Sequence, residues 1–494
     1  MKRKALYLIP VLLGTVFCFY YICLAGKNVA YSDYIRLINA YLPDVLNPAK
    51  FFVPDILTRV PVTYLGRIIN VKLFGLNTYF DMTLGVLSLA LGGLSLARYT
   101  ESETKEFRIS YAWFLLALFA YFSLNKWEML TNGTGWVCFL SISGFYIHYL
   151  VLNHAVRTGH KSSLDRGILL VLPSVLTLLI TGPYCGSYSA LLLLVYLVMM
   201  VYDYRKNHRI NRLYTAYFAA VLIPLLLYLW SNSMAVYVHR GAVGGSIIGT
   251  FLENPLFFLR FILKAFASAV LGSGQIEALK ESGSVFGTDG AVFLLGFFVI
   301  CLYLYALFLT WSYKIYEKTI FPLLLILNGG LNHLLILSAR WIFLQESYGM
   351  SSRYEIQYQM GMIGIILTFA IAAGLGRAAQ SDAQSGQPAQ LGQPVQPVQP
   401  GLAVRPARRR PPFQTTVIAL GAVIIFFGNF YTTKEELKTA PYRKAFLAMS
   451  EEVALDYENA SDEDLVAYLQ HDATEVRKAM KILEENNLNL FRNK

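Results

Sequence analysis

The chain opens with a basic start and a long apolar run, residues 1–26, MKRKALYLIPVLLGTVFCFYYICLAG. As a helix, this run is long enough to cross about 30 Å of hydrocarbon. A secretory signal peptide also begins with basic residues, but its apolar region is shorter and small residues precede its cleavage site. Here Tyr, Phe and Cys stand in their place. The stretch therefore predicts an uncleaved first transmembrane helix.

The composition of the whole chain is that of a membrane protein. Of its 494 residues, 55% are hydrophobic and 15% are charged, whereas soluble proteins of this size carry more charge. The net charge of +11 comes largely from basic loops between apolar segments, which argues against a nucleic-acid partner. Five cysteines lie in or beside apolar segments without a CxxC pair or a Cys/His cluster, so no disulfide framework is expected.

Apolar segments of about 18–22 residues recur along the chain and predict an all-α polytopic membrane protein. We expect about eleven transmembrane helices, at residues 5–25, 79–97, 109–124, 135–154, 167–182, 187–202, 213–231, 290–311, 320–340, 358–375 and 414–431.

Basic residues set the expected orientation of these helices. If Lys2, Arg3 and Lys4 stay in the cytoplasm, alternation places most of the Lys- and Arg-rich loops on the same side. This arrangement agrees with the positive-inside rule. An odd number of spans then puts the N-terminus inside and the C-terminus outside.

The regions of the chain differ in composition. Residues 1–375 hold most of the apolar segments and are expected to form a transmembrane core. Residues 376–413 are rich in Pro, Gln and Gly and predict a disordered cytoplasmic linker. After a last transmembrane helix at 414–431, residues 432–494 are charged and amphipathic, which predicts a small outward helical tail.

Two outward segments, about 26–78 and 232–289, are much longer than a turn requires. Within them, residues 33–42, 56–74 and 255–271 mix apolar and charged side chains. Such segments are too polar to span a membrane and too apolar for water, so we expect interfacial helices. For residues 255–271 a re-entrant helix is the alternative, and an extra pair of spans in this loop would change the count.

The short outward loop SARWIFLQESYGMSSRYEIQYQ, residues 338–359, conflicts with the charge rule. Short outward loops are usually poor in arginine. One other short outward loop holds Lys126, whereas this one carries both Arg340 and Arg353. The two arginines are therefore candidates for a functional role.

The layout resembles the GT-C superfamily of membrane glycosyltransferases, with many spans and a long first external loop that has an acid near its start. The pairing of SAR at 338–340 with SSRY at 351–354 resembles bacterial polytopic proteins found with surface-polysaccharide genes, as does the tail ending ENNLNLF. The resemblance implies sugar transfer from a polyprenyl-phosphate-linked donor to a cell-envelope glycan or lipid acceptor. It also implies the outer face of a bacterial cytoplasmic (inner) membrane.

Sugar transfer needs a positioned carboxylate, because the acceptor hydroxyl loses a proton as it attacks. Asp33, in YSDY directly after the first span, matches the family's acid and is expected to be the base. Its alternative role is an N-cap of the following helix. Glu128, in the outward loop NKWEMLTNGTGW, is a candidate second acid. Asp81, at the start of the second span, has the position of an N-cap.

The leaving lipid phosphate gains negative charge, which fixed cations would stabilise. We expect Arg340 and Arg353 to bind it, because a guanidinium group can pair with two phosphate oxygens. The alternative is a structural ion pair with Glu346 or Glu355.

Other candidate substrate-binding residues lie nearby. Tyr354 and Tyr358 are four residues apart and are expected to line a sugar-binding wall, with an interfacial aromatic belt as the alternative. His239 and Arg240 lie in the second long loop. The outward acids are scattered, so no metal site is expected, although some GT-C enzymes use a divalent cation.

Two other functions remain open. A polysaccharide polymerase or ligase would act on the same lipid-linked substrates. A transporter or flippase of lipid-linked saccharides usually needs ionisable groups inside its spans. The predicted spans hold few polar groups at mid-depth, apart from Asn328 and His333. The distance between Asp33 and the two loop arginines would decide whether one active site can contain them.

Overall fold

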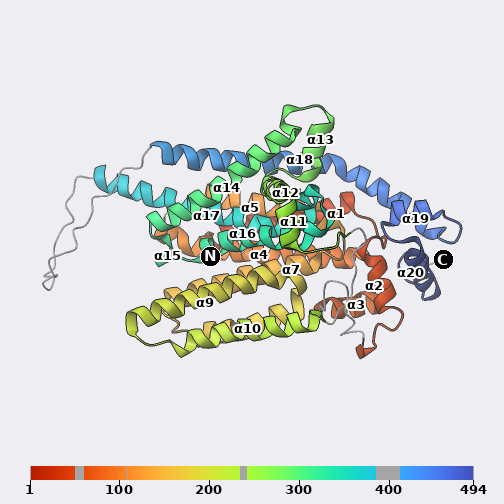
Figure 1. Ribbon diagram of the computed structural model, residues 1–494, viewed down its shortest axis with the longest axis horizontal. Helices are drawn as coiled ribbons and strands as arrows, with labels where there is room; N and C mark the ends of the chain where they lie inside the picture. The colour runs from red at the N-terminus through yellow and green to blue at the C-terminus, as the bar shows by residue number, and fades with distance from the viewer. Residues whose placement is uncertain (1, 50–60, 108, 234–241, 385–411, 493–494) are drawn as a thin grey trace.

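The computed structural model describes residues 2–49, 61–107, 109–233, 242–384 and 412–492. Its regular elements in these ranges are all helical, which confirms the all-α class (Figure 1). Within these ranges, ten helices are long and apolar enough to cross a membrane, as expected of a multi-pass protein. These are α1 (Lys2–Ala25), α4 (Thr78–Phe107), α7 (Trp136–Arg157), α8 (Ser163–Val175) with its π-helical continuation Leu176–Ile180, α9 (Cys185–Asn207), α10 (Arg212–Ser233), α14 (Asp289–Ser312), α16 (Phe321–Arg340), α17 (Glu355–Gln384) and α18 (Pro412–Leu455).

The span predicted at 109–124 is shorter than expected. Its α-helix, α5 (Tyr111–Phe122), has 12 residues, which is about 18 Å at 1.5 Å per residue. A 3-10 turn, η2 (Leu124–Lys126), and a short helix, α6 (Trp127–Thr131), follow it. This segment therefore does not form a single spanning helix.

The segment between α4 and α7 nevertheless runs back through the bundle. Gly133, just before α7, lies against Asp81 in the first turn of α4. At the other end of the two helices, Arg157 pairs with Glu103. The helices α4 and α7 therefore run parallel, and the chain between them must return along their length. The predicted third crossing is present as a broken one.

Lys126 stabilises the end of α5, where the helix is interrupted. Its Nζ donates hydrogen bonds to the backbone oxygens of Tyr121 at 2.7 Å and Ser123 at 2.8 Å. The last carbonyl groups of a helix have no partner within the helix, and no water is at hand inside a bilayer to replace one. Lys126 is wholly buried, so it is not the exposed loop residue that the sequence indicated.

The first long outward segment contains two helices, α2 (Asp33–Tyr41) and α3 (Pro61–Phe74), in agreement with the predicted ones. Part of the second predicted helix, residues 56–60, lies outside the described residues.

A buried polar cluster attaches both helices to α4. The carboxylate of Asp81 accepts hydrogen bonds from Tyr34 of α2 at 2.6 Å and from Asn70 of α3 at 3.0 Å. Arg67 lies 3.4 Å from the same oxygen, and both charged side chains are almost fully buried. Asp81 is thus a junction between three helices rather than an N-cap. It holds α2, and with it Asp33, against the membrane-spanning bundle.

The second long outward segment forms α11 (Ile247–Glu253), α12 (Pro255–Ser268) and α13 (Ser273–Glu281). A bend of 103° separates α12 from α13, as in a broken span or a re-entrant loop. Arg260 and Lys264 of α12 lie 3.6 and 2.8 Å from Glu346. The segment is therefore tied to the 338–359 loop.

The C-terminal region departs from the predicted boundaries. The helix α18 is continuous over 44 residues, so the expected end of the last span at 431 falls inside it. The first nine residues of the predicted linker, 376–384, prolong α17. Most of the rest of that linker, 385–411, lies outside the described residues. Figure 1 shows α18 running along the whole bundle to the tail helices α19 (Asp462–Leu469) and α20 (Ala473–Glu485).

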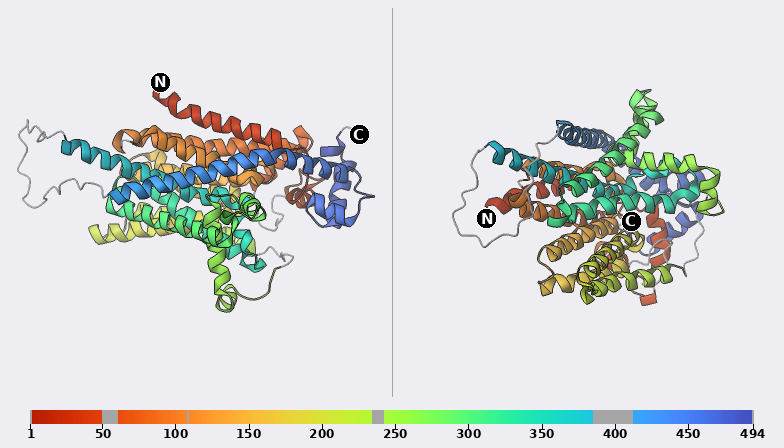
Figure 2. Two further views of the ribbon diagram at one scale, coloured as in Figure 1. Left: turned by 90° about the horizontal axis from the view of Figure 1, so that it is seen from above. Right: turned by 60° about the vertical axis from the view of Figure 1, so that its left-hand side comes forward.

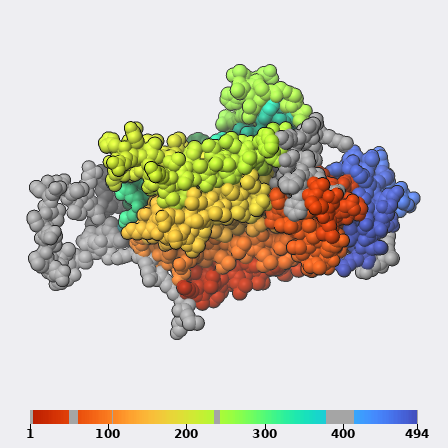
Figure 3. All heavy atoms as spheres, turned by 90° about the horizontal axis from the view of Figure 1, so that it is seen from below, coloured from red at the N-terminus to blue at the C-terminus, as the bar shows by residue number. Residues whose placement is uncertain are grey.

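The tail is built into the first outward segment and is not a separate appendix. Ile35 and Ile38 of α2 share a buried apolar core with Val476 and Met480 of α20. The backbone N–H of Ser32 also donates to the carbonyl of Leu469 at 2.8 Å. Figure 3 shows the blue tail against the red first segment at one end of the molecule. The two regions therefore fold as one unit at this end of the molecule.

We expect the Lys126→Met substitution to lower the free energy of unfolding by about 1–3 kcal/mol, because buried carbonyl oxygens would lose their donor. Thermal unfolding of the purified protein in detergent measures this effect. Lys206→Met, which replaces an exposed lysine near the end of α9, is the control and should change stability by less than about 0.5 kcal/mol. Equal stability of the two variants would contradict the role of Lys126.

Candidate functional site

The fold brings together Asp33, Glu128 and Arg353. Arg353 Nη1 lies 3.2 Å from Asp33 Oδ2, and Arg353 Nε donates to Glu128 Oε1. The arginine is 320 residues from Asp33 and 225 from Glu128 along the chain. Ser352 Oγ also donates to Glu128 Oε2 at 3.0 Å. Three residues predicted separately thus form one cluster, contributed by α2, α6 and the turn η8 (Ser352–Tyr354).

Asp33 does not act as the cap of its own helix. Ser32 occupies the N-cap position of α2, and no side-chain capping bond forms there. Asp33 is the first residue of α2, and its carboxylate points to Arg353. Ser32 has a positive φ of 53°, a conformation that a non-glycine residue holds only when its surroundings impose it. The hydrogen bond to Leu469 supplies that constraint, so the tail helps to position Asp33.

The cluster is accessible from solvent. The side chains of Asp33, Glu128 and Arg353 are 32%, 21% and 35% exposed. Because Arg353 is already bound to two carboxylates, a phosphate would have to compete with them for its N–H groups. Its predicted contact with phosphate stays a prediction.

Arg340 has different surroundings. Its Nε donates to the hydroxyl of Tyr354 at 2.6 Å, and its guanidinium lies over the Tyr354 ring. Among the described residues no carboxylate lies within ion-pairing distance of it. Arg340 pairs with neither Glu346 nor Glu355, the two acids that were predicted as possible partners. Glu346 binds the cations of α12, and Glu355 is fully buried. Arg340 is therefore the better placed of the two arginines to receive an anion.

The two tyrosines of this loop are largely buried. Tyr354 is 8% exposed and touches Arg340, so it borders the cluster. Tyr358 is completely buried, and its ring stacks on His333 with centroids 3.9 Å apart. Their rings do lie next to each other, with centroids 6.5 Å apart, but both are directed into the protein. Tyr358 thus contributes packing and not an open sugar-binding wall.

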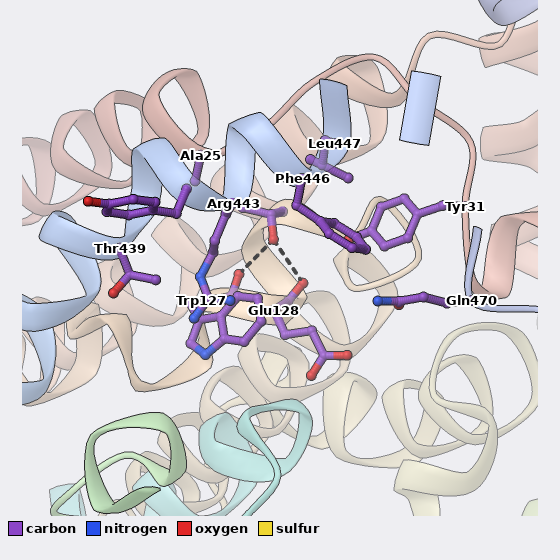
Figure 4. Close-up of a pocket in the computed structure, with 11 residues that line it drawn as sticks. Ala25, Tyr31, Trp127, Glu128, Thr439, Arg443, Phe446, Leu447 and Gln470 are labelled. Atoms are coloured by element: carbon purple, nitrogen blue, oxygen red, sulfur yellow. Dashed lines mark hydrogen bonds between the residues drawn. The ribbon is translucent and has the colours of Figure 1, made fainter. Parts of the chain in front are cut away.

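A pocket of about 390 Å³ lies beside Glu128. Figure 4 shows that its walls come from α6, α18, the segment before α2 and the tail. The lining residues are Ala25, Tyr31, Trp127, Glu128, Thr131, Thr439, Tyr442, Arg443, Phe446, Leu447 and Gln470.

Arg443 and Tyr31 give the pocket its fixed polar groups. The Arg443 guanidinium stacks on Trp127, with its carbon 3.1 Å from a ring centroid, and donates to the buried Glu436 at 2.7 Å. Burial, followed by the negative charge of Glu128, raises the pKa of Tyr31 to about 12. The Tyr31 hydroxyl therefore stays protonated at neutral pH and can donate a hydrogen bond.

Sequence reasoning did not find this pocket. The residues that α18 and the tail contribute lie in the region 432–494, which was predicted to be a small outward helical tail. The available signal was the amphipathic run after residue 432, whose aromatic residues had no assigned partner.

Other predicted features are not tested by this geometry. His239 and Arg240 lie outside the described residues. Within the described ranges, no three His, Cys, Asp or Glu side chains gather closely enough to hold a metal ion. The absence of a metal site stays a prediction.

In comparisons with known proteins, no protein-family model, curated protein or solved structure matches this chain.

We expect Arg353→Met to lower the free energy of unfolding by about 1–2 kcal/mol, because the carboxylates of Asp33 and Glu128 would face each other without a cation between them. Denaturation of the purified protein measures this loss. The triple variant Asp33→Asn, Glu128→Gln, Arg353→Met removes the repulsion and should regain most of the stability. If the triple variant is no more stable than Arg353→Met, charge repulsion is not the cause.

Proposed function

We propose that this protein is a membrane glycosyltransferase. It would move a sugar from a polyprenyl-phosphate-linked donor to a cell-envelope glycan or lipid acceptor at the outer face of a bacterial cytoplasmic membrane. The observation that carries the proposal is the contact of Arg353 with Asp33 and Glu128. It gathers two accessible carboxylates beside Arg340, an arginine with no described carboxylate partner.

The cluster has the groups that such a transfer requires. An acceptor hydroxyl attacks the anomeric carbon of the donor sugar while its proton passes to a carboxylate, which is general-base catalysis. The bond between sugar and phosphate breaks, and the lipid phosphate leaves with the electron pair. Arg340 would stabilise the phosphate charge. Arg353 would keep Asp33 and Glu128 in place.

A second cavity supports the proposal that the donor is linked to a lipid. A groove of about 510 Å³ lies between α1, α5 and α18, with almost entirely apolar walls that include Phe17, Phe119 and Phe430. Figure 2 shows α1 and α18 converging toward the end of the molecule that carries the C-terminus. An isoprenoid chain could lie in this groove, because its walls offer the apolar contact that such a chain seeks. The polar residues Thr433 and Lys434 line the same groove.

The charge distribution supports the proposed orientation. Arg157 lies at the end of α7 that is far from Asp33. The basic residues at the end of α9 would lie on the same side of the membrane as Arg157. The cluster would then face outward, with the N-terminus inside and the C-terminus outside, as the positive-inside rule indicates.

A polymerase or ligase would use the same chemistry and stays an alternative. Transport is the other alternative, and one observation bears on it. Asn328 and Asn332 of α16 form buried hydrogen bonds with each other, with Tyr149 of α7 and with Ser187 of α9. Bonds of this kind hold membrane helices together. These two asparagines are therefore accounted for by contacts between helices, which weakens their support for transport.

We expect Asp33→Asn and Glu128→Gln each to reduce sugar transfer, by about 10²–10⁴-fold for whichever residue is the base. The assay follows labelled sugar from polyprenyl-linked donor to glycan in vesicles whose outer face is accessible. Asp44→Asn, an exposed acid of the same outward segment, is the control and should transfer normally. Full transfer by both site variants would refute the proposed enzyme.

Arg340→Met should weaken donor binding and slow transfer, because the leaving phosphate would lose a cation. Arg260→Met, on α12, is the matched control because it removes an outward arginine that pairs with Glu346. A flippase would behave differently: the variants would leave the lipid-linked saccharide on the inner leaflet, which accessibility labelling detects.

A further inference from the structure

We propose that the pocket between α6 and α18 binds the acceptor as a neutral saccharide, with Glu128 the carboxylate that faces the acceptor hydroxyl. This inference rests on the proposed function and names the acceptor site that the function requires. Figure 4 shows Glu128 at the wall of the pocket, with Tyr31 and Phe446 across from it.

The size and lining of the pocket suit a sugar. Its volume of about 390 Å³ lies within the range of small-ligand sites, which combine aromatic walls with a few placed polar groups. Trp127, Tyr31, Tyr442 and Phe446 supply the rings, and Gln470 supplies an amide. Sugar rings present C–H faces that pack on aromatic rings and hydroxyl groups that pair with amides and hydroxyls.

The charges of the pocket favour a neutral ligand. The positive charge of Arg443 is held by the buried carboxylate of Glu436, which also accepts a hydrogen bond from Tyr21 at 2.6 Å. The negative charge of Glu128 is held by Arg353. Arg353 also pairs with Asp33, so Glu128 keeps part of its negative charge, whereas Arg443, the cation of the pocket lining, has a carboxylate partner. The lining therefore does not favour an anion. An anionic donor phosphate would instead favour Arg340, so donor and acceptor would occupy different places.

The two carboxylates of the cluster differ in what they face. Glu128 lines the pocket, whereas Asp33 does not. Arg353 and Ser352 each donate one hydrogen bond to Glu128, and a carboxylate has about four acceptor positions. Glu128 can therefore accept a further hydrogen bond from a saccharide hydroxyl and take its proton as that oxygen attacks the donor sugar. Asp33, held by the same arginine, would be the positioning acid.

The tail is part of this site. Gln470 ends α19 with a positive φ of 54°, and Tyr442, Arg443 and Phe446 stand on the outer part of α18. The proposed acceptor site thus requires residues from beyond the predicted end of the last span.

The test measures saccharide binding directly, with the full chain in lipid nanodiscs and saturation-transfer NMR. The probes are neutral trisaccharides of gluco, galacto, manno and rhamno configuration, a uronic-acid trisaccharide and inorganic phosphate. We expect at least one neutral trisaccharide to bind and the uronic acid and phosphate to compete poorly. Tyr442→Ala should weaken that binding by about tenfold or more, because it removes a pocket ring that is 76% exposed.

Gln470→Asn should also weaken binding, and it shortens the side chain while keeping a residue type that tolerates positive φ. Tyr202→Ala removes a tyrosine of similar exposure, 67%, from α9 and is the control that should bind normally. Lack of binding by every neutral trisaccharide, or unchanged binding in both pocket variants, would overturn the inference.

The same variants separate this inference from the proposed function. Asp33→Asn should bind the trisaccharide normally yet transfer sugar more slowly, because the positioning acid is lost. If Tyr442→Ala and Gln470→Asn transfer normally and no saccharide binds the wild type, the proposed acceptor site is refuted and the proposed transferase activity is retained. If the pocket binds saccharide but Asp33→Asn and Glu128→Gln transfer normally, the proposed transferase activity is refuted and the saccharide-binding site is retained.

Discussion

Arg353 is the residue on which the outer end of this molecule depends. Its guanidinium binds Asp33 of α2 and Glu128 of α6, and its own turn ends the connection between α16 and α17. Three parts of the chain that are distant in sequence are thereby held at one point. A guanidinium is suited to this because its planar array of donors can serve two carboxylates at once. The candidate active site is therefore also a structural junction.

The demands of a membrane environment explain the unusual third crossing. A helix that stops inside a bundle leaves carbonyl groups unpaired, and in hydrocarbon these groups must find partners within the protein. The buried Nζ of Lys126 is such a partner. The break lets α6 turn at this end of the bundle. Trp127 then lies beneath Arg443 in the pocket, and Glu128 both lines the pocket and binds Arg353.

The long final helix links this site to the tail. The middle of α18 lines an apolar groove, and the turns that follow line the pocket beside Glu128. The tail then packs on α2 and fixes Ser32 through Leu469, so that Asp33 sits between the tail and the bundle. A lipid-linked substrate and a water-borne one could approach the same carboxylates from these two sides, which is the arrangement that the proposed transfer needs.

The sequence by itself determined the class of fold, because apolar runs of spanning length report directly on the solvent around them. It also indicated the two loop arginines, because arginines on the outward side stand out against the charge pattern of membrane loops. Asp33 was indicated by the resemblance to GT-C enzymes, and Glu128 by its place in a predicted outward loop. Only the tertiary structure decided that Arg353 bridges Asp33 and Glu128, that Lys126 is buried, that Tyr358 packs inside the bundle and that the tail helps to form the pocket. These features depend on contacts between distant segments, and spacing along one chain does not specify which helix faces meet.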